Sequence, residues 1–354
     1  IDWPSKPGLP VDTLRREMNA ILDRAESIGL NALIFQARPS CDAFYRSELE
    51  PWSEYLTGAS GTPPADPDYD PLREWIDGAH ARGIELHAWI NPFRARHFQA
   101  ESPNAATHIA TVRPELVREY AKYQWLDPGE PDAQDHSMRV IMDLITRYDL
   151  DGIHFDDYFY PYPDGKAQFP DDRPWQAWLT AERAAGREPA DTQAARDDWR
   201  RANINRFVQR MYTDVKLAKP WVRVGISPFG IWRPGHPPGI KGFDAYAGLF
   251  ADAKLWAEQG WCDYLAPQIY WRIDSKEQNH EALLDWWLTV FPPGMERDLF
   301  VGNYTSRIPS DPAAKVGDRT SWEPEEILRQ IELTRTRAGI APEGQKPRGR
   351  GAGG

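Results

Sequence analysis

Two adjacent carboxylates, Asp156 and Asp157, stand in the run LDGIHFDDYFYPYP at residues 150–163. The run begins as an apolar strand and continues into tyrosine, phenylalanine and proline. Two neighbouring carboxyl groups in a half-buried pocket resist ionising together, so one of them holds its proton to higher pH. Such a pair beside aromatic surface suits glycoside hydrolysis. We predict that both aspartates are catalytic, with Asp156 inside the fold and Asp157 at the rim; ordering of the loop 160–175 is the alternative.

The adjacency of the two aspartates limits the mechanism. Side chains this close do not obviously straddle a glycosidic bond as the usual two-carboxylate scheme requires. They suit a substrate-assisted reaction, in which the N-acetyl oxygen of the sugar attacks, one aspartate orients that amide and the other acts as the acid. A partner from another strand, such as Asp42, is the competing option.

Further polar and aromatic side chains follow or line the predicted strands near their C-terminal ends, where barrel enzymes carry their chemistry. We predict that they bind the substrate, and some have structural alternatives. His87 could fill the interior, bonded to Glu85 or His154, and Arg38 could form an internal ion pair instead of clamping Asp156 or the substrate. The predicted substrate-binding residues are Arg38, Asp42, His87, Asn91, His154, Tyr158, Tyr160, Trp232, Gln268, Tyr270, Trp271 and Asn303.

The composition excludes several other functions. A net charge of −11 argues against a nucleic-acid partner, and no run of 18 apolar residues predicts a membrane span. The chain has no Cys/His ligand spacing and no glycine-rich phosphate loop, so we expect neither metal nor cofactor. Ser227 lacks the G-x-S-x-G turn of a hydrolase triad. The 16 tryptophans, about half of which we assign to packing, suit stacking against sugar rings.

The elements that must position these side chains alternate along the chain. Six predicted strands are each followed by a helix, which indicates a parallel sheet with helices outside. The strands are expected at 31–38, 84–91, 151–159, 221–229, 262–271 and 298–304. The main helices are expected at 11–29, 70–83, 131–149, 191–218, 244–258, 277–290 and 324–338.

The two faces of the strands decide between a doubly wound sheet and a barrel. In strand 84–91, Leu86 and Ala88 share an apolar face, whereas His87 and Asn91 share a face that becomes polar toward the C-terminal end. A doubly wound sheet needs two apolar faces, so we predict an α/β fold of the (β/α)8 TIM-barrel type. Six strands do not close it, and we expect strands one and eight to be missing or replaced. Residues 1–340 are predicted to form one barrel domain and residues 341–354 a disordered tail.

Five stretches of the chain resemble the glycosyl-hydrolase-like family ten: DGIHFDDYFYPYP, FQARPSCDAFYRSELEPWSEYLTG, YDPLREWIDGAHARGIELHAWINPFR, VGISPFGIWRPG and DYLAPQIYW. The resemblance extends from Ile1 to about Tyr304. It implies a bacterial (β/α)8 barrel enzyme, secreted, periplasmic or lipid-anchored, that cleaves peptidoglycan glycan strands stripped of peptide. Asp156 and Asp157 match the acidic pair of the family. Family members usually have a strand before the IDWPS segment and another after the helix that ends near Gly339, and we expect both to be missing or replaced here.

The sequence therefore predicts a glycoside hydrolase that acts on an amino-sugar polysaccharide, most specifically on peptide-free peptidoglycan strands. A non-catalytic carbohydrate-binding barrel and a hydrolase of another exopolysaccharide are the alternatives. The polysaccharide is the expected partner, and the oligomeric state is left open.

Overall fold

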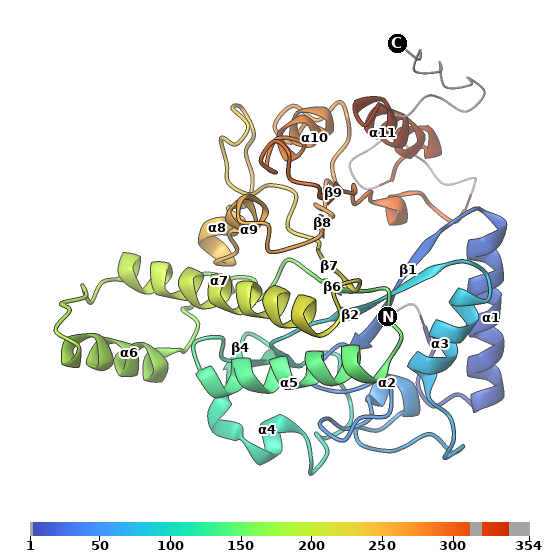
Figure 1. Ribbon diagram of the computed structural model, residues 1–354, viewed down its shortest axis with the longest axis horizontal. Coiled ribbons are helices and arrows are strands. Elements are labelled where there is room, and N and C mark those ends of the chain that lie inside the picture. The colour runs from blue at the N-terminus through green and yellow to red at the C-terminus, as the bar shows by residue number, and fades with distance from the viewer. Residues whose placement is uncertain (1–2, 312–320, 340–354) are drawn as a thin grey trace, which may run out of the picture.

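A computed structural model of the protein describes residues 3–311 and 321–339 (Figure 1). Its main feature is a parallel sheet of six strands in the order β1-β2-β6-β7-β8-β9. These strands are β1 Ala32–Arg38, β2 Glu85–Ile90, β6 Gly152–Phe155, β7 Arg223–Ile226, β8 Tyr264–Leu265 and β9 Asp298–Leu299. The tail expected at 341–354 and the position after Gly339 lie outside the described residues.

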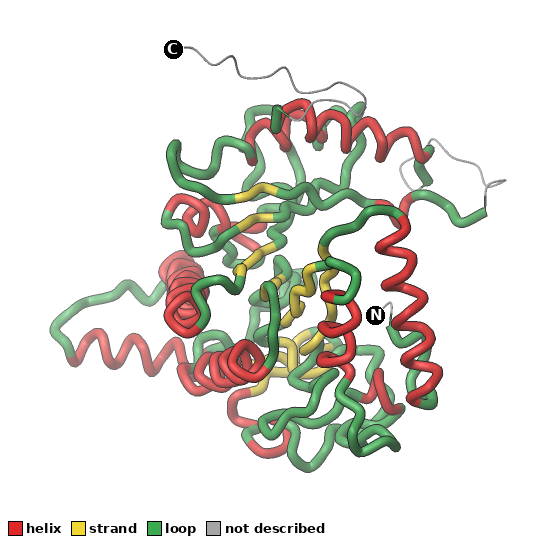
Figure 2. Tube along the Cα trace, turned by 45° about the vertical axis from the view of Figure 1, so that its right-hand side comes forward, coloured by secondary structure: helices red, strands yellow, loops and turns green. Residues whose placement is uncertain are grey.

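The order of the six strands distinguishes the two architectures that the sequence allowed. Spatial order follows chain order throughout, whereas a doubly wound sheet reverses direction at a switch point. The strands form a curved sheet with the helices outside it (Figure 2). The predicted α/β barrel-type fold is confirmed. Within the part of the chain that the structure describes, no strand pairs with the outer edges of β1 and β9.

Several strands are shorter than predicted, because the chain leaves regular pairing before the polar side chains appear. The strand expected at 262–271 is reduced to Tyr264–Leu265, and Pro267 follows it. Proline has no N–H to donate to the ladder. Gln268 nevertheless continues the arrangement through isolated parallel bridges to Phe229 and Gly302. The loop ends of β7, β8 and β9 therefore stay in register above the sheet.

Helices cover the outer face of the sheet. The long ones are α1 Val11–Ser27, α3 Pro71–His80, α5 Pro131–Arg147, α6 Asp172–Ala184, α7 Gln193–Ala218, α10 His280–Trp287 and α11 Pro324–Arg337. Short helical turns are α2 Glu54–Thr57, α4 Ile109–Val112, η1 Pro114–Leu116, α8 Ala245–Gly248, α9 Ala253–Glu258 and η2 Thr305–Arg307. The prediction of a single helix at 244–258 is wrong. The chain forms α8 and α9, which are separated by Phe250 at a φ of 55°, a left-handed conformation that a helix cannot contain.

A second, antiparallel sheet was not predicted. It consists of β3 Arg94–Arg96, β5 Tyr123–Leu126 and β4 Val117–Tyr120, in the order β3-β5-β4. The sequences of β3 and β4, RAR and VREY, show too little alternation of apolar and polar residues to be recognised as strands. The sheet lies between β2 and α5 in the chain and fixes the position of Arg94 near the loop that follows β6.

One apolar core connects helices and sheet, from Leu14 and Leu22 of α1 to Val290 after α10. The lumen side of the sheet is filled by larger polar groups. Tyr264 crosses it so closely that a Cβ on Gly225 would lie 1.8 Å from the tyrosine ring. In the described residues, no helix has the length and apolar character needed to cross a membrane.

Candidate active site

The acidic pair lies at the point where β6 ends. All four residues of that strand are buried, and the chain leaves it at Phe155. Asp156 is half-buried, whereas Asp157 is only 3% exposed. The Asp157 backbone N–H donates to Asp156 Oδ1 at 3.0 Å, which turns the loop back on the strand end. Asp157 is thus the more deeply buried of the two, contrary to the rim position predicted for it, because the loop folds over its side chain.

Each aspartate has its own side-chain hydrogen-bond donor, a distant one for Asp156 and one from the same loop for Asp157. Gln268 Nε2 donates to Asp156 Oδ1 at 2.8 Å and to the Ser227 carbonyl at 3.0 Å. The Tyr162 hydroxyl donates to Asp157 Oδ2. Gln268 is itself fixed by its bridges to the neighbouring strands, so it reaches Asp156 across the top of the sheet.

The electrostatics of the pair favour a retained proton. Burial, together with the charge of Asp156, raises the pKa of Asp157 to about 8. The Tyr162 hydrogen bond works in the opposite direction and limits the rise in this pKa. Like charges held this close cannot both ionise easily, so the pair carries one proton at neutral pH. An acid and a carboxylate are therefore available side by side.

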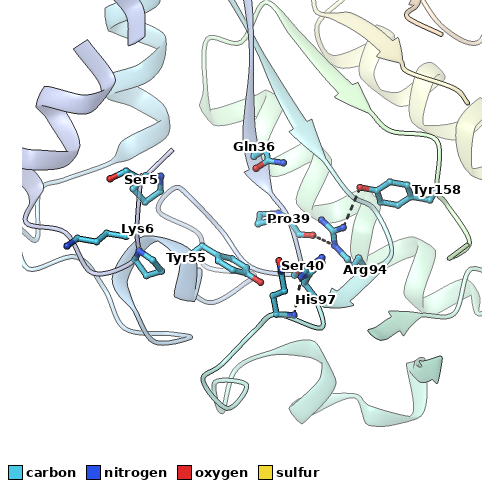
Figure 3. Close-up of a pocket in the computed structure, with 12 residues that line it drawn as sticks. Ser5, Lys6, Gln36, Pro39, Ser40, Tyr55, Arg94, His97 and Tyr158 are labelled. Carbon is cyan, nitrogen blue, oxygen red and sulfur yellow. Dashed lines mark hydrogen bonds between the residues drawn. The ribbon is translucent and has the colours of Figure 1, made fainter. Parts of the chain in front are cut away.

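Tyrosines surround the pair; Tyr158, Tyr270 and Tyr304 are half-buried, and Tyr162 is exposed. Tyr158 receives a hydrogen bond from Arg94 Nη1 at 3.4 Å, and the guanidinium lies over its ring (Figure 3). On another side, Tyr270 packs against Tyr304 with ring centroids 4.7 Å apart. Burial, followed by the charges of the two aspartates, raises the pKa of Tyr270 to about 12, which indicates that this tyrosine lies near them. Tyr162 adds its ring beside Tyr158, at a centroid distance of 6.1 Å. These side chains can hold a sugar through hydroxyls and ring faces.

Of the predicted set, Asp156, Asp157, Tyr158, Gln268 and Tyr270 come together at this site. The sequence did not single out Arg94 and Tyr304. Arg94 lies three residues after Asn91, and Tyr304 follows Asn303 directly. A search for site residues that extended a few positions past each predicted strand end would therefore have included both.

Arg38 is placed away from any substrate. It is fully buried, and its guanidinium donates to Glu50 at 2.5 and 2.8 Å and to the Asn91 carbonyl at 2.6 Å. Glu50 also bonds to His136 Nε2 at 2.8 Å. The structure therefore shows the internal ion pair that the sequence analysis gave as the alternative. The prediction that Arg38 contacts the substrate is wrong, because no part of its side chain is exposed.

Asn91 and Asp42 shape the loops beneath the site. Asn91 is fully buried, and its Oδ1 accepts the Phe93 and Arg94 N–H groups at 3.1 and 2.7 Å. Asp42 is 6% exposed and accepts the Ser40 N–H at 2.8 Å. Burial raises the pKa of Asp42 to about 6. Both side chains hold turns in shape, and in the described part of the chain neither forms a hydrogen bond with the acidic pair.

The two histidines of the predicted set lie inside the sheet. His87 Nδ1 and His154 Nδ1 approach the Tyr264 hydroxyl at 2.8 and 2.9 Å. Burial lowers the pKa of both rings, that of His154 to about 3, so both are neutral. Both rings fill the lumen, which is the alternative given for His87. The prediction that they contact the substrate is wrong for both, because His87 is 4% and His154 5% exposed.

Tyr160 and Trp232 both pack against other aromatic side chains. Tyr160 is 1% exposed and lies between Phe169 and Phe250, so it is a core residue rather than a stacking platform. Trp232 is half-buried and stacks on Trp286 at 5.9 Å.

Two further residues of the predicted set lie near the ends of β8 and β9. Trp271 packs edge-on against Phe229, at 5.6 Å. Asn303 donates to Gln330 of α11 at 2.9 Å. Trp232, Trp271 and Asn303 keep partial exposure, and substrate contact by them stays a prediction.

Across residues 3–311 and 321–339, no three His, Cys, Asp or Glu side chains come together in a way that could hold a metal ion. The side chains at the site supply two carboxyls with one proton, an amide and several phenols.

Comparison with known proteins relates this geometry to a family. The model of the family described as Glycosyl hydrolase-like 10 matches residues 1–318. The chain is 38% identical over 341 residues to glycosyl hydrolase YngK of Bacillus subtilis (strain 168), covering 95% of this chain and 63% of that protein. It is 30% identical over 361 residues to glycosyl hydrolase DigH of Escherichia coli (strain K12), covering 94% of this chain and 77% of that protein. The chain thus spans less than two thirds of the length of the Bacillus relative.

Among solved structures, the glycoside hydrolase domain of PgaB (BpsB) from Bordetella bronchiseptica has a similar fold. The TM-score is 0.57 at 14% sequence identity, and the likeness covers 93% of this chain and 87% of that one. At this identity the similarity concerns the fold alone.

Proposed function

The chain belongs to the Glycosyl hydrolase-like 10 family, and from this premise we propose that it hydrolyses glycosidic bonds in an amino-sugar polysaccharide, namely peptide-free peptidoglycan glycan strands. The observation that carries the proposal is the Asp156–Asp157 pair at the carboxyl end of β6. It retains one proton at neutral pH and lies among half-buried tyrosines. Such strands lie outside the cytoplasmic membrane, so the proposal implies an enzyme of the cell envelope, whether secreted, periplasmic or lipid-anchored.

In the proposed reaction the acetamido carbonyl oxygen of the substrate attacks the anomeric carbon as the bond to the leaving oxygen breaks. The leaving oxygen takes the proton that the pair holds. Water then opens the cyclic intermediate, and the proton released returns to the pair. Asp156 is half-exposed, so it is the member that contacts the sugar, while buried Asp157 sets how tightly the proton is held. Gln268 fixes the carboxylate of Asp156 for this step.

Substitution of the pair tests the proposal. We expect Asp156→Asn and Asp157→Asn each to reduce the release of reducing ends from peptide-free strands by roughly 10²- to 10⁴-fold, the range of general acid–base catalysis. Asp164→Asn is the matched control, because Asp164 is an exposed aspartate of the same loop. It should retain wild-type activity. Wild-type activity in both variants of the pair would refute the assignment.

A substrate panel tests the chemistry. A reaction assisted by the acetamido group fails on a polymer whose amino sugars carry no acetyl group, whereas it proceeds on acetylated strands. Chromatography of the digests separates cleavage from mere retention of glycan by a binding barrel. Cleavage of the deacetylated polymer alone would favour a hydrolase of another exopolysaccharide and would refute substrate assistance.

A further inference from the structure

A pocket of about 320 Å³ lies against the loop that carries the acidic pair. It is bounded by residues 4–7, which precede α1, and by the chain around the start of β3 (Figure 3). Tyr158, the residue after Asp157, belongs to its wall. A polysaccharide chain that places one sugar at the carboxylates therefore has room for a neighbouring substituent in this pocket.

The pocket is basic, although the whole chain carries a net charge of −11. Lys6, Arg94 and His97 line it, and none of the residues that line it is acidic. The acidic pair adjoins the pocket through Tyr158, and two further acids accept hydrogen bonds from residues of this lining. Glu17 accepts from the Ser5 N–H and hydroxyl, and Asp42 accepts from the Ser40 N–H.

Arg94, Lys6 and the His97 ring, whose pKa burial and the Arg94 charge lower to about 4, keep donors available for a ligand. Arg94 donates through Nε to the Pro39 carbonyl at 2.9 Å and through Nη1 to the Tyr158 hydroxyl. Within the described chain no carboxylate forms an ion pair with Arg94 or with the exposed Lys6. His97 Nδ1 accepts the Gln99 N–H at 3.2 Å, which leaves the ring proton on Nε2 as a further donor.

Three neutral polar atoms of the same lining are unsatisfied. Gln36 Oε1, Ser40 Oγ and the Tyr55 hydroxyl are buried and have no hydrogen-bond partner among the described residues. Buried polar groups normally have partners, so their gathering around one pocket points to a polar ligand. Guanidinium and ammonium donors beside two hydroxyls suit a carboxylate, whereas Gln36 Oε1 is an acceptor that suits a hydroxyl of the same sugar.

We propose that this pocket binds the carboxylate of an acidic sugar next to the bond that is cleaved. The proposal rests on the proposed function and names its substrate more closely. In a peptide-free strand the lactyl ether of each N-acetylmuramic acid ends in a free carboxylate. In a peptide-bearing strand the same carboxyl is an amide and carries no charge. Lys6 and Arg94 would therefore select peptide-free strands over peptide-bearing ones.

Calorimetry with two matched oligomers tests the proposal without relying on cleavage. One is a peptide-free oligomer of alternating N-acetylglucosamine and N-acetylmuramic acid, and the other is the same oligomer with its carboxyl groups reduced to alcohols. The Asp156→Asn protein is used so that the oligomers stay intact. We expect about tenfold tighter binding of the carboxylated oligomer, the effect of one charge-assisted hydrogen bond. Adding Lys6→Gln or Arg94→Gln should move the ratio of the two affinities toward one.

Lys122→Gln is the control, because Lys122 is exposed in the turn between β4 and β5 and does not line the pocket. It should leave the ratio at the parent value. Equal affinity of the parent for both oligomers would overturn the carboxylate proposal, as would a ratio that survives both pocket substitutions. Either result leaves the cleavage assay with the Asp156 and Asp157 variants to judge the proposed function separately.

Discussion

Gln268 Nε2 lies 2.8 Å from Asp156 Oδ1, although the two residues are 112 positions apart in the chain. The contact joins the end of β6 to the end of β8 across the intervening strand β7. It holds one oxygen of the half-exposed carboxylate in a fixed direction. We therefore regard Gln268 as a positioning residue for Asp156.

Gln268→Leu removes this donor, and we expect kcat to fall about 10- to 100-fold with little change in KM, as for the loss of one hydrogen bond to a charged group. Gln268→Glu places a further carboxyl against the pair, so it should move the pH dependence of kcat/KM to higher pH. A role in folding alone would leave that profile in place. Gln259→Glu, an exposed site after α9, is the control. An unchanged profile in Gln268→Glu would contradict the assignment.

The pH dependence of the wild type follows from the raised pKa of Asp157. Burial and the charge of Asp156 bring this pKa to about 8, so kcat/KM should fall as the pH rises through about 8 and the pair loses its proton. The Tyr162 hydroxyl stabilises the ionised form of Asp157 and lowers its pKa. Tyr162→Phe should therefore shift the falling limb to higher pH.

Profiles of initial rate against pH measure this shift. Tyr123→Phe is the matched control, because Tyr123 is another partly accessible tyrosine but lies in β5, away from the acidic pair. A limb that moves to lower pH in Tyr162→Phe, or one that moves equally in the control, would contradict the role given to the Tyr162 hydrogen bond.

The buried ion pair of Arg38 and Glu50 predicts an effect on stability. Although burial opposes ionisation, Arg38 and His136 hold the pKa of Glu50 down at about 2. Glu50→Gln leaves the Arg38 cation buried without a counter-charge and should lower the free energy of unfolding by about 3–5 kcal/mol. Denaturation in urea measures it. Because the pKa of Glu50 is lowered, its contribution is present above about pH 4.5 and is lost as the pH falls toward 2.

The matched control for this substitution is Glu277→Gln, since Glu277 pairs with Lys241 while both side chains are more than half exposed. Exposed ion pairs contribute about 0–1 kcal/mol, so the control should unfold close to the wild type. Equal effects of the two substitutions would show that Glu50 does not compensate a buried charge.

The sequence by itself determined the order of the main elements and the type of fold. Strands such as 84–91 have one apolar face and one face that becomes polar, and this period of two is a local property that survives folding. Adjacent carboxylates after a buried strand likewise remain neighbours in any fold, so Asp156 and Asp157 could be located without coordinates. The motifs around them were also sufficient to indicate the family.

Only the tertiary structure decided which polar residues surround that pair. Alternation gives the direction of a side chain but not its depth. Arg38, His87, His154 and Tyr160 were all named as substrate-binding residues, with interior alternatives kept for Arg38 and His87, and all four are buried. Their partners Glu50, Tyr264 and Phe250 come from distant segments. The basic pocket could not be predicted from the sequence either, because Lys6 and Arg94 line one pocket only when the chain ahead of α1 folds next to the start of β3. Long-range packing sets burial, and burial separated the residues that can meet a substrate from those that hold the sheet together.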